Sequence, residues 1–217
     1  MLSRLQGHLA SIYQVDPGYD VSDFLITDPL IAAYLGKGSL LSNTQETVLV
    51  QEDEDELALS VFLDDEILSR LKDADPLRNL CVTDLNDLWT VLEGISHFNY
   101  IVWSAQKNRK ISLLELEMQA EVDKFISTLI MALHQEDTEL ADKMHGWLFD
   151  DVHFNSNLND DQRERYATAN NYAARFCHGF RQRFQRNNHK GLHELRRFYR
   201  LSQHEKISHI HSAVFAQ

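Results

Sequence analysis

"DLNDLWTVLEGISHFNYIVWSAQ", residues 84–106, is followed after the short basic connection "KNRKI" by "SLLELEMQAEVDKFISTLIMALHQ", residues 112–135. Apolar residues recur in both segments at helical spacing, and in the first segment they cover most of the circumference. A connection this short joins antiparallel neighbours. The two segments therefore predict a central antiparallel helix hairpin that holds the core.

The rest of the chain is predicted to be helical, with one exception near the N-terminus. The runs "ETVLVQ" and "LALSVFL", separated by the acidic "EDEDE", predict a β-hairpin at about 46–63 without a third strand. Further helices are expected within 3–15, 28–39, 65–73, 138–152, 160–186, 189–201 and 202–215. The predicted fold class is mainly α, a helical bundle with a central antiparallel helix hairpin and one small N-terminal β-hairpin.

Composition indicates an ordinary folded protein. A chain of 217 residues with 43% hydrophobic and 25% charged residues suits a single domain, 1–217. Cys81 and Cys177 lie far apart without a CxxC partner, which argues against a disulfide framework and fits a reducing compartment. No run of about 18 apolar residues occurs. We therefore expect a cytoplasmic protein that does not enter a membrane.

Charge is distributed unevenly along the chain. Residues 161–217 contain 11 Lys and Arg but only 4 Asp and Glu, whereas the first 160 residues contain 10 against 29. We therefore distinguish an acidic part, 1–158, with helices from about residue 65, from a basic helical part, 159–217. A basic region of this kind binds phosphate groups, or the acidic part of its own or another chain.

The leading functional hypothesis rests on arginines in the basic part, which outnumber lysines there nine to two. The planar guanidinium suits pairing with phosphate or carboxylate. We predict a non-catalytic protein without a cofactor, which binds an acidic protein, a nucleic acid or a phosphate ligand, or self-associates into a homo-oligomer. The candidate contacts are Arg175, Arg183, Arg186, Arg196, Arg197 and Arg200. Ion pairs within the chain are the structural alternative.

The alternative function is a metal-dependent, di-iron-like bundle enzyme. Glu93 and His97 lie one turn apart on a polar stripe of the first long helix, and a hairpin centred near residue 109 sets His97 level with Glu121. Di-iron bundles take Glu and His ligands from facing helices, although with i, i+3 rather than i, i+4 spacing. Glu93, His97 and Glu121 would bind a transition metal such as iron. A half-buried, hydrogen-bonded His97 explains the same stripe without metal.

Two further carboxylates near the start of the second long helix have simpler explanations. "SLLE" forms a capping box, in which Ser112 accepts a hydrogen bond from the N–H of Glu115, and Glu115 accepts one from the N–H of Ser112. Glu117 is expected on the outward, solvated face. No motif in the sequence places the chain in a named family.

Overall fold

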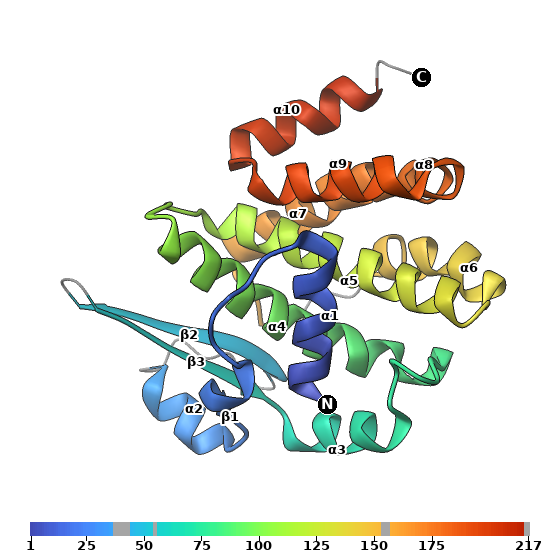
Figure 1. The fold of residues 1–217 in the computed structure, drawn as a ribbon. Helices are drawn as coiled ribbons and strands as arrows, with labels where there is room; N and C mark the ends of the chain where they lie inside the picture. The colour runs from blue at the N-terminus through green and yellow to red at the C-terminus, as the bar shows by residue number, and fades with distance from the viewer. Residues whose placement is uncertain (37–43, 54–55, 153–156, 215–217) are drawn as a thin grey trace.

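The computed structural model describes residues 1–36, 44–53, 56–152 and 157–214. Its centre is the predicted helix hairpin, formed by α4 (Leu85–Gln106) and α5 (Leu113–His134), which run antiparallel (Figure 1). The mainly helical fold with a small N-terminal sheet is therefore confirmed. Both long helices begin and end within one residue of the predicted limits, because their apolar spacing is regular throughout.

Helix α5 is buried on nearly all sides. It packs against α4, α6 (Thr138–Phe149) and α7 (Asp160–His178). Ala169 and Ala173 of α7 are fully buried, and their small side chains allow α7 to approach closely. Between Glu115 and Ala132 every residue of α5 is buried except the half-buried Glu121. Polar residues of α5 must therefore find partners inside the protein.

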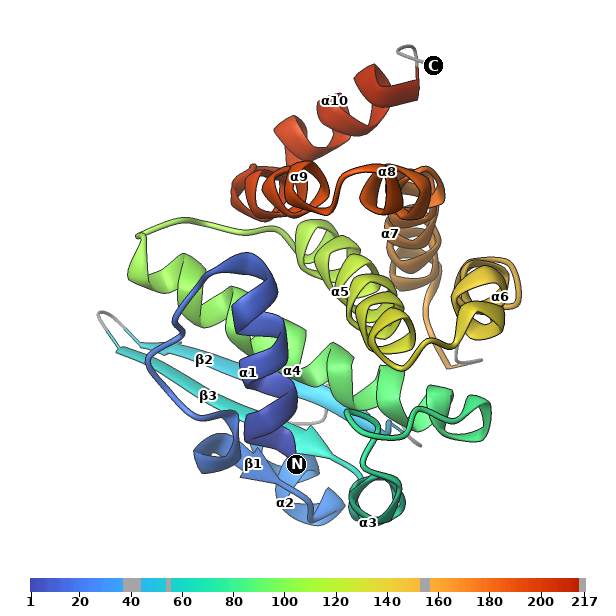
Figure 2. The same cartoon turned by 45° about the vertical axis from the view of Figure 1, so that its right-hand side comes forward.

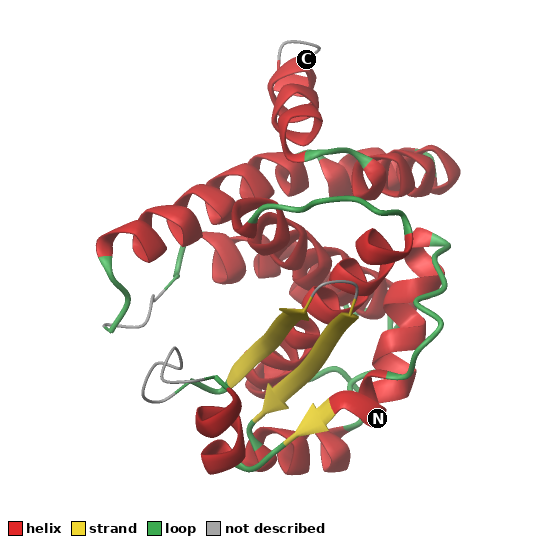
Figure 3. Ribbon diagram, turned by 90° about the vertical axis from the view of Figure 1, so that its left-hand side faces the viewer, coloured by secondary structure: helices red, strands yellow, loops and turns green. Residues whose placement is uncertain are grey.

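The sheet lies against one side of α4 (Figure 3). Strands β2 (Glu46–Asp53) and β3 (Glu56–Leu63) form the predicted antiparallel hairpin, with Val48 opposite Val61. A third strand, β1 (Leu25–Ile26), pairs parallel to β3 and gives the order β1-β3-β2. The prediction of no third strand is wrong, since two residues are too few to show an alternating pattern. Strand β2 is the outer strand on the side away from β1.

Short helices surround this centre. Helix α1 (Leu2–Tyr13) crosses α4, and η1 (Val21–Phe24) leads into β1. Helix α2 (Pro29–Leu35) begins at the Asp28 cap and ends before Gly36, and residues 37–43 lie outside the described residues. Helix α3 (Asp65–Ala74) and η2 (Val82–Asp84) precede α4. None of the helices in the described ranges combines the length and apolar character that a membrane span requires.

The C-terminal helices lie on the other side of the hairpin from the sheet (Figures 1 and 2). They are α8 (Phe180–Arg186), α9 (Asn188–Arg200) and α10 (Gln203–Val214), and α7, which begins near β2, leads into them. The prediction of one continuous helix over 160–186 is wrong, because α7 ends at His178 and Gly179 separates it from α8. Glycine is a poor helix former, and the apolar spacing alone did not reveal the break.

Candidate functional site

A cavity of about 630 Å³ lies beside the outer strand β2, where α4, α5 and α7 meet it. Its polar lining comes from elements far apart in the sequence, and includes Glu46, His97, Glu117, Gln162, Arg165 and Tyr166. Apolar residues line the rest, among them Val48, Ile101 and Leu116. A mostly apolar cavity with a few convergent polar groups is the usual form of a ligand site.

His97 lies at the base of this cavity between two carboxylates. Its Nδ1 is 3.5 Å from Glu46 Oε1, and its Nε2 is 3.4 Å from Glu117 Oε2. The residue is 7% exposed, yet neither His97 Nε2 nor Glu46 Oε1 has a hydrogen-bond partner among the described residues. Burial lowers the pKa of His97, but Glu117 and Glu46 outweigh it and hold that pKa well above 6.5.

Glu46 reaches His97 because the hairpin approaches α4 at a glycine. Glu46 is the first residue of β2 and pairs with Leu63. A Cβ on Gly94 would lie 3.1 Å from Glu46 Cγ and 3.2 Å from Leu63 Cδ2, so only glycine leaves room for this approach without a shift. Burial raises the pKa of Glu46 to about 7, although His97 acts in the opposite direction.

Lys124 joins two further carboxylates at the same place. Its Nζ is 2.9 Å from Glu93 Oε2 and 2.8 Å from Glu121 Oε1. Burial alone would lower the pKa of Lys124, but the two carboxylates raise it above its usual range. Burial acts to raise the pKa of Glu93, but Lys124 and His97 together act more strongly in the opposite direction. The pKa of Glu93 is therefore lowered. For Glu121 burial outweighs Lys124, and the pKa is raised.

The structure changes the predicted pairing of the two long helices. His97 faces Glu117, and Glu121 lies with Lys124 near Glu93, so the actual pairing differs from the predicted one by one helical turn. The prediction that Glu117 lies on the outward face is wrong, because its side chain is only 8% exposed. Strand β2 and helix α7 cover the face of α5 that the sequence left open to solvent.

Helix α7 contributes a cation to this site. Arg165 Nε lies 3.9 Å from Glu117 Oε1 and is buried without a hydrogen-bond partner among the described residues. Its guanidinium carbon lies 5.4 Å from the centre of the Tyr166 ring. Burial raises the pKa of Tyr166, and Glu117 and Glu93 raise it further.

Three of these residues form a group with the spacing of a metal site. One ligand atom each from Glu46, Glu93 and His97 lies within 4.8 Å of the others. Neighbouring ligand atoms on an ion with bonds of about 2.0–2.2 Å lie about 3.0–3.6 Å apart, so the side chains would move inward to bind one. Two of the predicted ligands, Glu93 and His97, thus lie together, whereas Glu121 contacts Lys124 instead.

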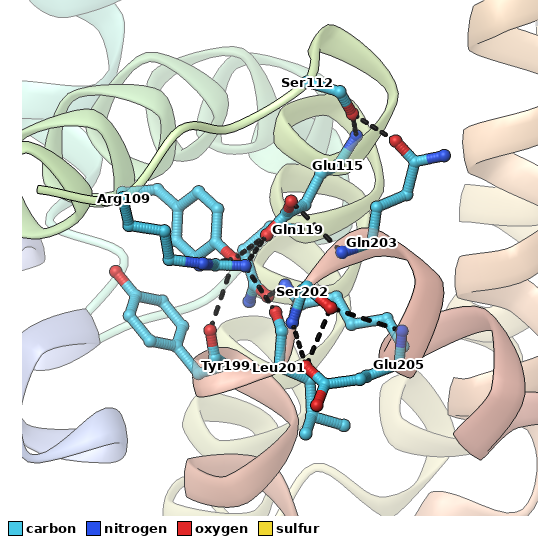
Figure 4. A network of polar contacts seen from close by, with 11 residues as sticks. Arg109, Ser112, Glu115, Gln119, Tyr199, Leu201, Ser202, Gln203 and Glu205 are labelled. Carbon is cyan, nitrogen blue, oxygen red and sulfur yellow. Dashed lines mark hydrogen bonds and ion pairs between the residues drawn. The ribbon is translucent and has the colours of Figure 1, made fainter.

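A second buried polar cluster lies at the start of α5 (Figure 4). Ser112 accepts a hydrogen bond of 3.0 Å from the N–H of Glu115, as predicted. The second predicted hydrogen bond of the capping box, from the N–H of Ser112 to the Glu115 carboxylate, is wrong. The Glu115 carboxylate accepts hydrogen bonds from Arg109, from Tyr100 and from the N–H of Gln203. This cluster joins the α4–α5 connection to the α9–α10 turn and has a structural role.

Lys206 of α10 is fully buried beside this cluster. Its Nζ donates a hydrogen bond of 2.5 Å to Gln119 Oε1 and lies 4.5 Å from the centre of the Tyr100 ring. Burial lowers the pKa of Lys206 to about 7. Gln119 in turn donates to Asp123, whose pKa burial raises to about 6. Glu115, Gln119 and Asp123 thus lie on a different face of α5 from Glu117, Glu121 and Lys124.

The six predicted arginine contacts divide into two sets. Arg183 pairs with Glu194, while Arg196 and Arg200 donate to backbone oxygens at the end of α1, including Ile12 O and Tyr13 O. These bonds satisfy carbonyls that the helix leaves unpaired. The other three, Arg175, Arg186 and Arg197, are exposed.

The predicted metal site lacked four residues that the structure brings to it: Glu46, Glu117, Lys124 and Arg165. For Glu117 and Lys124 the sequence contains a signal, because they share a helical spacing with Glu121, as Glu93 and His97 do on the facing helix. The positions of Glu46 and Arg165 depend on how β2 and α7 pack, which local patterns do not show. The chain matches no protein-family model, no curated protein and no solved structure.

Proposed function

We propose that this protein binds one divalent transition-metal ion at the base of the cavity, with Glu46, Glu93 and His97 as ligands. The observation that supports it is the geometry of this buried group. Three ligand atoms lie within 4.8 Å of one another, and Glu46 Oε1, which faces His97 Nδ1, is buried without a hydrogen-bond partner among the described residues. Unsatisfied polar atoms of this kind are costly unless something binds them.

The charge balance supports a cation. Four carboxylates, Glu46, Glu93, Glu117 and Glu121, share this region with the two permanent cations Lys124 and Arg165. Without metal, protons on His97 and on Glu46 offset the excess negative charge. A divalent ion offsets the same charge and displaces those protons.

The ligand set indicates the type of ion. One imidazole with two carboxylates suits Mn²⁺, Fe²⁺ or Zn²⁺, whereas Mg²⁺ and Ca²⁺ favour sites made of oxygen alone. Three protein ligands beside a cavity leave a coordination position open, as in metal sites that act on a bound molecule. The proposal thus takes up the metal site of the alternative function considered from the sequence, a metal-dependent bundle enzyme, with Glu46 in place of Glu121 as a ligand.

The test is direct measurement of metal binding by protein without a histidine tag. Calorimetric titration of metal-free protein with Mn²⁺ and with Zn²⁺ should give one site, and Mg²⁺ should compete poorly. His97→Ala should weaken binding by more than about 100-fold, since loss of an outer partner alone costs about 10- to 100-fold.

His204→Ala is the matched control, because His204 is exposed on α10. That variant should bind Mn²⁺ as the wild type does. A folded wild-type protein that binds neither ion, or equal affinity in the His97→Ala variant, contradicts the proposal.

Partner binding through the C-terminal arginines stays a second prediction. The exposure of Arg175, Arg186 and Arg197 supports it, as does the absence of a carboxylate partner for them within the described ranges. Replacing these three by Ala should abolish any salt-dependent binding of RNA or an acidic protein; binding that is unaffected contradicts it. Self-association and a cytoplasmic location also stay predictions. The free cysteines Cys81 and Cys177 support the cytoplasmic location.

A further inference from the structure

Several exposed apolar side chains line the cavity, beside polar ones such as Thr47 and Gln51. Leu35 of α2, Val50 of β2 and Leu113 of α5 all line it, and they are 44%, 48% and 59% exposed. Single exposed apolar side chains are common on proteins. Three that gather from separate elements at one cavity are unusual, and they indicate a ligand with an apolar part.

The lining of the cavity also includes a cation, Arg165, which can bind an anion. The buried Arg165 Nε has no hydrogen-bond partner among the described residues, and its nearest carboxylate contact, Glu117 Oε1, is at 3.9 Å, beyond hydrogen-bond length. A guanidinium binds carboxylate or phosphate with two parallel hydrogen bonds. Arg165 thus retains the capacity to bind a second oxyanion.

Arg165 and the metal group are neighbours. A single carboxylate, that of Glu117, lies within 3.9 Å of Arg165 and within 3.4 Å of the ligand His97. An oxyanion that fills the open coordination position of the metal would therefore be within reach of Arg165.

We propose that the cavity binds a small amphiphile with a carboxylate or phosphate head group and an apolar body. The head group binds Arg165 and the metal ion, and the body lies against Leu35, Val50 and Leu113. This inference rests on the proposed function, because the metal ion supplies one of the two groups that bind the head group, and the Glu117 carboxylate beside Arg165 would repel an anion that lacks it.

The first experiment titrates Mn²⁺-loaded and metal-free protein with octanoate and with octyl phosphate. Octanol and octylammonium have the same chain without the anionic head. The two anions should bind Mn²⁺-loaded protein at one site, and either anion alone would identify the head group. Octanol and octylammonium should bind at least about tenfold more weakly. Bound Mn²⁺ should also broaden the ³¹P signal of octyl phosphate, which reports that the head group lies near the ion.

Arg165→Gln should weaken anion binding by about 10- to 100-fold, the effect of removing a charge-assisted hydrogen bond. The matched control is Arg163→Gln, because Arg163 is exposed on the same helix. Both variants should still bind Mn²⁺, which shows that the site is folded.

The two proposals fail in different ways. One bound Mn²⁺ without binding of either anion overturns the inference and leaves the proposed function intact. Equal anion binding with and without Mn²⁺, or equal binding by Arg165→Gln and wild type, also overturns the inference. Absence of binding of both Mn²⁺ and Zn²⁺ overturns the proposed function, and the inference with it.

Discussion

His97 Nε2 and Glu117 Oε2 face each other at 3.4 Å, between the two central helices. The same imidazole lies 3.5 Å from Glu46 on β2, so it connects α4 to both α5 and the sheet. A buried histidine between two carboxylates is stable without metal only when it carries a proton. Metal binding to one ring nitrogen would therefore displace the proton from that nitrogen, while the other nitrogen keeps its N–H.

The pKa of His97 should fall in the variant Glu117→Gln. Burial lowers this pKa, and the carboxylates of Glu117 and Glu46 raise it well above 6.5. The stabilisation from the proton is fully present below pH 6.5 and is lost as the pH rises through the pKa of the folded protein. NMR titration of the His97 ring measures the change, with Glu139→Gln on the exposed side of α6 as control. An unchanged pKa would show that Glu117 does not hold the proton.

Loss of Lys124 should be costly, because Glu93 and Glu121 would then share a buried site without their cation. Lys124→Met should lower the free energy of unfolding by about 3–5 kcal/mol near pH 7. Lys143 forms a pair with Glu139 that is mostly exposed, so Lys143→Met should change it by less than about 0.5 kcal/mol. Denaturant unfolding measures both, and equal effects would contradict this account of Lys124.

Local patterns in the sequence predicted the helices and the hairpin but not the packing between them. The apolar spacing of residues 84–106 and the cap at Ser112 are local, and both gave the correct limits for α4 and α5. The contact between His97 and Glu46 joins residues far apart in the chain. It depends on the room that Gly94 leaves, which no periodic pattern records. Glu117 was predicted to lie in solvent because no local pattern records that α7 and β2 lie beside its face of α5.

Arg200 should stabilise the fold rather than bind a partner. Both of its terminal nitrogens lie 3.2 Å from Tyr13 O at the end of α1, where a positive charge also favours the helix dipole. Arg200→Ala should lower the free energy of unfolding by about 1–3 kcal/mol. Arg197→Ala, on the exposed face of the same helix, should have little effect. Equal stability of the two variants would contradict the capping role.

Stability should rise with pH above 7 because of Lys206. Burial lowers its pKa to about 7 in the folded protein, against 10.5 ordinarily. Between these values the unfolded chain holds a proton that the folded protein lacks. The free energy of unfolding should therefore rise by up to about 1.4 kcal/mol per pH unit, and this contribution is lost as the pH falls through 7. Lys206→Met should remove it, while Lys190→Met at an exposed position should not. Urea unfolding at pH 7, 8 and 9 measures the free energy of unfolding of each protein. An equal change with pH in Lys206→Met and in the wild type would contradict the assignment of this effect to Lys206.

Gly94→Ala should weaken metal binding while it leaves the stability of the protein nearly unchanged. The added methyl group would lie 3.1 Å from Glu46 Cγ and 3.3 Å from Glu46 Oε1, so the Glu46 side chain must move by a few tenths of an ångström. Alanine favours a helix over glycine by about 1 kcal/mol, which offsets the crowding, and the free energy of unfolding should change by less than about 1 kcal/mol.

Displacement of Glu46 from His97 in this variant should weaken Mn²⁺ binding by about tenfold, as loss of a positioning contact does. The control is Gly7→Ala on α1, because a Cβ there meets nothing within 4 Å. Gly7→Ala should therefore gain stability and bind Mn²⁺ as the wild type does. Parallel calorimetry and denaturant unfolding of the two variants measure both quantities. Unaltered Mn²⁺ affinity in Gly94→Ala would mean that Glu46 is not a ligand, and that β2 only covers the site.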